Sequence, residues 1–156
     1  MLHPATTDDL DDLADFLRTA DLTVAALAEP AVHLWLERDD AGAVRATTGF
    51  ELGEGGTHAL VRSVAVRPDL RGAGDGLRLA HFALDRAADA GARQAWLFSR
   101  RSGGFWQRLG FAATTTDALA AALPDAHQVR LFRSTGQLSR EVAWRRPLSA
   151  SDRLAG

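Results

Sequence analysis

The chain has 156 residues, of which 46% are hydrophobic and 24% are charged, and its formal net charge is −2. This length and composition are typical of a single globular domain and exclude a disordered or collagen-like chain, and no apolar run approaches the roughly 20 residues that cross a bilayer. The small negative charge argues against non-specific nucleic-acid binding. We therefore expect one domain over residues 1–156, located in the cytoplasm, that binds neither nucleic acid nor membrane.

The residue types that are missing restrict the chemistry. All 18 basic residues are arginine, and the chain has no tyrosine and no cysteine. These absences exclude a phosphate-binding lysine, a Schiff-base lysine, a phenolic acid, a cysteine nucleophile, disulfides and thiolate metal sites. No pair of histidines has the spacing of metal ligands, so we expect no metal.

Capping residues and apolar spacing predict the first elements. Thr6 and Thr7 are candidate caps, the aspartates after them suit the positive end of a helix dipole, and apolar residues then recur at helical spacing to Leu17. These features predict a helix with a solvated acidic first turn. Residues 21–29 are predicted to form a second short helix, which Pro30 ends.

Three strands are predicted next. Alternating apolar residues place them at 32–37, 43–50 and 58–66. A glycine-rich turn at 53–56 separates the last two, and a second glycine-rich segment follows Pro68. An amphipathic helix then runs to Gly91, with Asp85 expected to lie away from its apolar stripe. The stripe consists of Leu77, Ala80, Leu84, Ala87 and Ala88.

The second half of the chain alternates strands and helices. Strands are predicted at 94–98, from Phe111 onward and at 140–146, and helices at 103–109 and 117–123. A meander of three strands followed by this alternation predicts a mixed α/β fold.

The segment before the long helix carries the strongest functional signal. In Arg71-Gly72-Ala73-Gly74-Asp75-Gly76, glycine occurs at every second position directly before a helix. Such a loop turns successive backbone N–H groups toward one point, where the helix dipole adds positive potential and the missing side chains let a phosphate approach. Arg71 adds a forked donor with a permanent charge. We therefore expect a pyrophosphate ligand at this loop.

Two common phosphate motifs do not fit the loop, because the dinucleotide fingerprint requires Gly-x-Gly-x-x-Gly and the nucleotide P-loop requires a lysine. The pattern Arg-x-x-Gly-x-Gly, preceded by Val-x-Pro at 66–68, resembles motif A of the GNAT superfamily of acetyl-CoA-dependent N-acetyltransferases. The run from Phe105 to Phe111 resembles the second landmark of that family, a short helix that ends in Leu-Gly-Phe.

Within the superfamily, the chain is similar to the small amino-acid N-acetyltransferases. These are the short-form N-acetylglutamate synthases and the similar proteins of arsenic-resistance operons. The similarity lies in residues 60–66 and 104–111, and more loosely in the C-terminal segment.

The resemblance implies the GNAT fold, in which a central mixed, mostly antiparallel sheet splays between its fourth and fifth strands and is flanked by helices. Acetyl-CoA, as cosubstrate, would lie in the gap between the strand that ends at Val66 and the strand around Trp96. Its pantetheine would bind the backbone of Val64, Ala65 and Val66, and its pyrophosphate the loop of Arg71, Gly72, Ala73, Gly74, Asp75, Gly76 and Leu77. Asp75 departs from the family pattern, because a carboxylate near a pyrophosphate repels it unless the side chain points to solvent.

The resemblance also implies where the acid would lie. The tyrosine that often serves as acid in the family corresponds to Trp106 here, which cannot donate a proton in that way. Ser99 or solvent is expected to serve instead, since the pKa of a thiol is about 8.5. Glu51 is the candidate base, with a surface carboxylate as the alternative, and His58 is a second candidate that would act through water.

Arg62 and Arg133 are the candidate acceptor-binding residues. An arginine inside a strand needs a partner, and an acceptor carboxylate would bind Arg62 bidentately; an ion pair with Glu51 or Glu141 is the alternative. Arg133, with Arg130, would form a second carboxylate clamp or lie on a solvated helix face.

These features predict an acetyl-CoA-dependent N-acetyltransferase that moves an acetyl group to the amine of a small amino-acid-like acceptor by direct attack. One alternative is a catalytically degenerate GNAT module that binds acyl-CoA or a partner protein. Another is an enzyme that acts on a protein N-terminus or a polyamine. A homodimer is one possible assembly, because many GNAT proteins dimerise.

Overall fold

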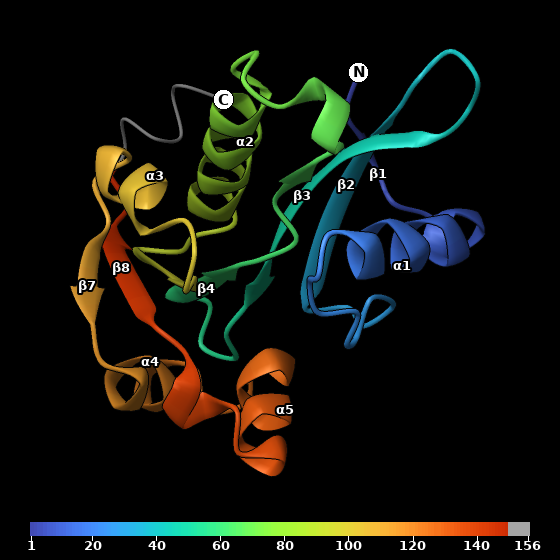
Figure 1. Ribbon diagram of the computed structural model, residues 1–156. Helices are drawn as coiled ribbons and strands as arrows, with labels where there is room; N and C mark the ends of the chain where they lie inside the picture. Colours follow the sequence, from blue (N-terminus) through green and yellow to red (C-terminus); the bar gives the residue numbers. More distant parts are fainter. Residues whose placement is uncertain (150–156) are drawn as a thin grey trace.

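One open sheet joins all the strands of the computed structural model, which describes residues 1–149 (Figure 1). The last part of the expected domain, residues 150–156, lies outside the described residues. The strands pair in the order β1-β2-β3-β4-β6-β8-β7, and β5 pairs with β3. Their bounds are β1 His3–Pro4, β2 Val32–Arg38, β3 Val44–Leu52, β4 His58–Val61, β5 Ala65–Val66, β6 Gln94–Phe98, β7 Ala112–Thr114 and β8 Ala143–Pro147.

The sheet is mixed, because β4 and β6 run parallel while the other described pairings are antiparallel. A parallel pair needs a crossover connection, and here α2 supplies it. The predicted mixed α/β fold with a mostly antiparallel sheet is therefore confirmed.

Helices cover both faces of the sheet (Figure 1). Their bounds are α1 Leu10–Thr19, α2 Asp75–Asp89, α3 Gly103–Arg108, α4 Thr116–Ala122 and α5 His127–Thr135. On one face, α2 and α3 pack with Phe50, Val61 and Leu97 in the largest core. On the other face, α4 and α5 pack on Leu60 and Trp96, and α1 packs on β2.

Successive strand residues alternate between these two faces, which fixes the direction of Glu51. Glu51 lies opposite Val32 on β2 and Leu60 on β4, and cross-strand neighbours share a face. The Glu51 side chain therefore points to the face that α1, α4 and α5 cover.

The structure differs from the sequence-based prediction at residues 21–29, which form turns and not a helix. Asp21 and Ala26 have left-handed φ angles of 58° and 60°, which a right-handed helix does not accommodate. The Arg62 side chain donates hydrogen bonds to the carbonyl oxygens of Thr23 and Ala25, so a long-range contact holds the turns.

Two details of the helices also differ from the prediction. The buried face of α2 is rotated relative to the predicted apolar stripe. Leu77, predicted in the stripe, is 48% exposed, whereas Leu79 and Asp85, predicted outside it, are buried. The prediction omitted α5, although it begins shortly after the expected stop at Pro124.

Candidate functional site

The sheet opens between β4 and β6 after Leu60 and Trp96, their last residue pair. Beyond it, β5 turns away from β6 and pairs only with β3 among the described strands. Ser63, at the break, has a left-handed φ of 61°, and its carbonyl oxygen accepts a 2.6 Å hydrogen bond from the Thr47 hydroxyl. The segment predicted as one strand over 58–66 is thus two strands, and the predicted splay is confirmed.

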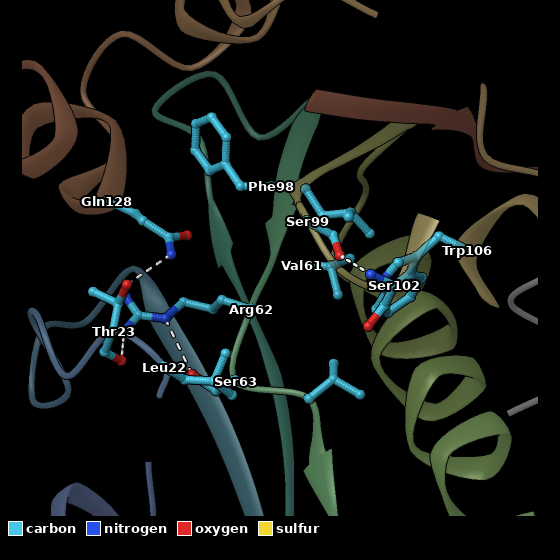
Figure 2. Close-up of a pocket in the computed structure, with 12 residues that line it drawn as sticks. Leu22, Thr23, Val61, Arg62, Ser63, Phe98, Ser99, Ser102, Trp106 and Gln128 are labelled. Atoms are coloured by element: carbon cyan, nitrogen blue, oxygen red, sulfur yellow. Dashed lines mark hydrogen bonds between the residues drawn. The ribbon is translucent and has the colours of Figure 1, made fainter. Parts of the chain in front are cut away.

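A cavity of about 120 Å³ lies at this opening (Figure 2). Its walls come from the break between β4 and β5, the end of β6, the loop before α3, the turns after α1, and α5. The residues that line it are Leu22, Thr23, Val61, Arg62, Ser63, Val64, Leu97, Phe98, Ser99, Ser102, Trp106 and Gln128.

The glycine loop follows β5, which forms one edge of the opening, and leads into α2. Gly72 and Gly74 have φ angles of 90° and 86°, in the left-handed region that glycine adopts without strain. Gly74 caps α2, and α2 begins at Asp75, so the unpaired N–H groups of the first helical turn point out of the loop. This is the geometry of an anion site at a helix N-terminus.

Asp75 does not present a free negative charge to this loop. Its carboxylate accepts hydrogen bonds from Arg78 at 2.9 and 3.3 Å, and an Arg45 nitrogen lies 3.8 Å from its other oxygen. Arg78 also bonds Glu37, which Met1 and Arg45 contact as well. The two carboxylates of this cluster are therefore matched by cations, which reduces the repulsion that Asp75 would exert on a phosphate.

Arg62 lines the cavity, and its side chain is 1% exposed. Its guanidinium donates to the carbonyl oxygens of Thr23 and Ala25 and to the Ser63 hydroxyl, and its Nη1 lies 3.8 Å from Glu51 Oε1. Burial lowers the pKa of Arg62, and the Glu51 charge opposes that shift. Nη1 is buried without a hydrogen-bond partner. Arg62 thus has the predicted ion pair with Glu51 and still holds one unused donor group.

Glu51 is 2% exposed and does not line the cavity. Its Oε2 accepts hydrogen bonds from the backbone N–H of His127 at 2.7 Å and lies 2.8 Å from His127 Nδ1. The carboxylate is therefore held behind Arg62 and not on the surface.

Ser99 and Trp106 face the cavity from the other side (Figure 2). The Ser99 Oγ accepts a 3.1 Å hydrogen bond from the backbone N–H of Ser102, which leaves its hydroxyl proton available for donation. Trp106 is 7% exposed and packs edge-on against Phe105 and Phe111.

The other two expected residues lie away from the cavity. Arg133 is exposed on α5, and His58 lies at the start of β4, where its Nδ1 accepts a 3.0 Å hydrogen bond from Trp96. Sequence reasoning missed Thr23 and Gln128, which both line the cavity and are joined by a 3.0 Å hydrogen bond from the Gln128 side-chain amide to the Thr23 hydroxyl. No local signal marks these two, because they come from segments whose structure was predicted wrongly or omitted.

Residues 1–149 contain neither a candidate metal centre nor a candidate membrane span. No group of three or more histidine and acidic side chains lies close enough to hold a metal ion. In the same part of the chain, no helix is long and apolar enough to span a membrane.

Comparisons with known proteins agree with this geometry. A model of a family described as the acetyltransferase (GNAT) family matches residues 3–111. A comparison with curated protein sequences finds no match.

Several solved structures share the fold. N-acetylglutamate synthase from Neisseria gonorrhoeae, complexed with coenzyme A and N-acetyl-glutamate, has a TM-score of 0.74 at 18% identity; the match covers 96% of this chain and 35% of that chain. Rv2747 from Mycobacterium tuberculosis, in complex with coenzyme A and NLQ, has a TM-score of 0.73 at 18% identity, with 96% and 99% covered. An aminoglycoside 6′-N-acetyltransferase from Enterococcus faecium has a TM-score of 0.66 at 11% identity, with 94% and 96% covered. The chain thus spans about a third of the gonococcal synthase and nearly the full length of the other two proteins.

Proposed function

Because the chain belongs to the acetyltransferase (GNAT) family, we propose that it transfers the acetyl group of acetyl-CoA to the amine of a small amino-acid-like acceptor. The observation that carries this proposal is the opening between β5 and β6, which contains a cavity and begins beside a glycine loop at a helix N-terminus. The acceptor amine would attack the thioester directly while both substrates are bound.

The free edge of β5 would hold the pantetheine of acetyl-CoA. Ala65 and Val66 bond β3 on one side and have no described strand on the other, so their backbone groups and those of Val64 are free to bind an extended ligand. The loop from Arg71 to Leu77 would bind the pyrophosphate through backbone N–H groups. Coenzyme A in the gonococcal and mycobacterial neighbours supports this assignment.

The transfer itself needs few groups from this chain. The amine nitrogen forms a bond to the carbonyl carbon, the carbon–sulfur bond breaks, and the sulfur leaves as a thiolate. Backbone N–H groups at Val64 to Val66 would stabilise the developing oxyanion, and the Ser99 hydroxyl would donate a proton to the sulfur and recover one from solvent. A thiolate whose conjugate acid has a pKa of about 8.5 also takes a proton readily from water.

The polar wall of the cavity favours an acceptor that carries a carboxylate. Arg62 supplies a buried cation with an unused donor, and Thr23 and Gln128 supply neutral hydrogen-bonding groups. No acidic side chain is among the described lining residues, which argues against a polyamine acceptor. Arg133, exposed on α5, would serve as an outer contact for a second carboxylate.

The test begins with calorimetric titration of the protein with acetyl-CoA. Release of free coenzyme A is then followed with a thiol reagent across L-glutamate, L-glutamine, L-arginine, spermidine and a short peptide; a chain without cysteine gives no background signal. We expect binding at one site and fastest turnover with an L-amino acid. Arg62→Ala is expected to raise KM for that acceptor, with Arg86→Ala, an exposed arginine near the end of α2, as the control.

A second candidate function is binding of acyl-CoA without turnover. It is favoured by the absence of tyrosine and by the buried Trp106 that occupies the position where the family resemblance places an acid. Tight binding of acetyl-CoA with no turnover on any of the amines would select this alternative.

A further inference from the structure

Glu51 and His127 form a contacting pair that has no role in the acetyl transfer proposed for this chain. They lie 76 positions apart in the sequence, on β3 and at the start of α5. Glu51 Oε2 accepts from the His127 backbone N–H at 2.7 Å and lies 2.8 Å from the ring Nδ1. A carboxylate that contacts both the backbone and the ring of one histidine fixes where that ring points.

The hydrogen bonds determine which ring nitrogen carries the proton. An ionised carboxylate only accepts hydrogen bonds, so the contact between Glu51 Oε2 and Nδ1 requires a proton on Nδ1. The other oxygen, Oε1, lies 3.8 Å from the Arg62 guanidinium, and a cation at that distance suits the ionised form. The neutral imidazole then has its lone pair on Nε2, which is the form that accepts a proton.

This imidazole does not itself line the cavity, but it lies next to residues that do. Arg62, which contacts Glu51, lines the cavity, and so does Gln128, the residue after His127. The His127 side chain is 29% exposed, whereas its partner Glu51 is 2% exposed. A buried carboxylate and a partly exposed imidazole that it orients form the arrangement by which a histidine acts as a base.

We propose that His127, oriented by Glu51, accepts the proton that the acceptor amine must lose before or as it attacks the thioester. This inference rests on the proposed acetyl transfer. The acceptor ammonium gives one proton to Nε2 through an intervening water, and the free amine attacks. The second proton of the attacking nitrogen leaves to solvent as the amide forms, and the imidazolium later gives its proton to solvent as well. Glu51 is then a positioning residue, which sets the tautomer and balances the imidazolium charge.

The charges around the pair are consistent with a neutral ring that can gain a proton. Arg62 and Glu51 are opposite charges, so one added proton on His127 leaves a single net positive charge at a partly exposed position. The charged groups near the pair on its own segments include Asp125, two residues before His127, Arg130, three residues after it on α5, and Glu54, three residues after Glu51. These two carboxyl groups interact with each other, and the interaction raises the pKa of Glu54.

The matched variants are His127→Asn, Glu51→Gln and, as control, His81→Asn. Asparagine places an N–H near the position of Nδ1 and keeps the hydrogen bond to Glu51, but it has no basic nitrogen. Glutamine at 51 can donate to Nδ1 and so favours the tautomer whose Nε2 already carries a proton. His81 is exposed on α2 and lies outside the site.

The kcat/KM of each protein is measured against pH with acetyl-CoA and L-glutamate, or with whichever of the five amines is acetylated fastest. We expect His127→Asn and Glu51→Gln to lower it at neutral pH by on the order of 10²-fold or more. The wild type and His81→Asn would show a limb in which kcat/KM rises with pH as one proton is lost, and His127→Asn would lose that limb. A His127→Asn protein with the full rate and the same limb would overturn the proposal.

A second measurement does not depend on turnover. Long-range nitrogen–proton NMR spectra of the wild-type protein report the tautomer of each histidine, and we expect a proton on Nδ1 of His127 that moves to Nε2 in Glu51→Gln. A wild-type His127 with its proton on Nε2 would overturn the assignment. If acetyl-CoA binds but none of the amines is acetylated, it is the proposed function that fails, whatever the tautomer of His127.

Discussion

At the scale of single residues, Asp9 connects the first helical turn to the sheet. Its carboxylate accepts from the hydroxyl and the backbone N–H of Thr6 and from the Arg38 guanidinium at 2.7 Å. The Arg38 hydrogen bond, with that from the Thr6 backbone, lowers the pKa of Asp9 to about 2. Because the unfolded-state pKa is about 3.9, the ionised form stabilises the fold above that pH, and the stabilisation is lost as pH falls through the folded-state value.

Asp9→Asn is therefore expected to lower the free energy of unfolding at pH 7 by about 1–2 kcal/mol. The difference between the two proteins should shrink below about pH 4 and become small near pH 2, where the wild-type carboxyl in the folded protein is half protonated. Urea unfolding at a series of pH values measures this. Asp11→Asn, at an exposed position of the same helix, should change stability by no more than about 0.5 kcal/mol. A difference for Asp9→Asn that is constant from pH 2 to 7 would contradict the argument.

Asp75 gives a prediction in which affinity and stability change in opposite directions. Asp75→Asn leaves Arg45 and Arg78 without this carboxylate beside the loop proposed to bind pyrophosphate. Acetyl-CoA affinity is expected to rise by roughly 3- to 10-fold, and stability to fall by about 0.5 kcal/mol because an acidic residue leaves a helix N-terminus. Calorimetry and urea unfolding measure the two effects. Asp117→Asn, in the first turn of α4, should lower stability similarly and leave the affinity unchanged; weaker binding by Asp75→Asn would refute this reading.

At the scale of elements, the turn into α2 depends on the backbone of Gly74. Its φ is 86°, and a Cβ there would meet no heavy atom within 4 Å, so conformation and not space opposes a side chain. Gly74→Ala is expected to cost about 1 kcal/mol of stability and to weaken acetyl-CoA binding about tenfold, because relief of the strain moves the N–H groups of the loop. Gly104→Ala, equally open but without a left-handed φ, is the control and should leave both unchanged. Equal affinities for the wild type and Gly74→Ala would count against the loop as the pyrophosphate site.

The elements predicted well are those whose signal is local. The strand at 94–98 agrees with β6 residue for residue, because a short buried run bounded by turn residues needs no distant partner to be recognised. Residues 21–29 failed because Arg62, far along the chain, holds the carbonyl oxygens of Thr23 and Ala25. The helix α5 was missed because six of its nine residues are polar and the structure buries only Val129 of them all.

At the scale of the whole molecule, the opening should make stability depend on the ligand. Acetyl-CoA that binds only the folded protein adds about 2.7 kcal/mol at a concentration of 100 times Kd, which for a chain of this length raises Tm by roughly 5–10 °C. Scanning calorimetry with acetyl-CoA tests this, with ATP as a phosphate control that lacks pantetheine. The Gly74→Ala protein should show a smaller rise at the same ligand concentration, and equal rises with ATP and acetyl-CoA would argue against a pantetheine site along β5.

The candidate site could be predicted from the sequence only where it is contiguous. The loop from Arg71 to Leu77 and the landmark at 105–111 are single segments, so both can be recognised as motifs, while pyrophosphate binding by the loop stays a prediction. The acceptor wall combines Thr23, Arg62 and Gln128 from three distant segments, and no spacing rule connects them. Glu51 was identified as a candidate base, but its burial behind Arg62 and its histidine partner depend on how α5 packs, which the sequence alone did not show.

The arginines around the start of α2 have a chemical consequence for a protein that handles a thioester. Arg45, Arg71 and Arg78 supply the side-chain positive charge there, and the chain contains neither lysine nor cysteine. Thioesters acylate free amines and thiols without any catalyst, whereas a guanidinium stays protonated and is not a nucleophile. The α-amino group of Met1 is held in an ion pair with Glu37 at 3.2 Å. These arginines can therefore attract the anionic ligand without reacting with its acyl group. Prolonged exposure to acetyl-CoA should leave their side chains without covalent adducts.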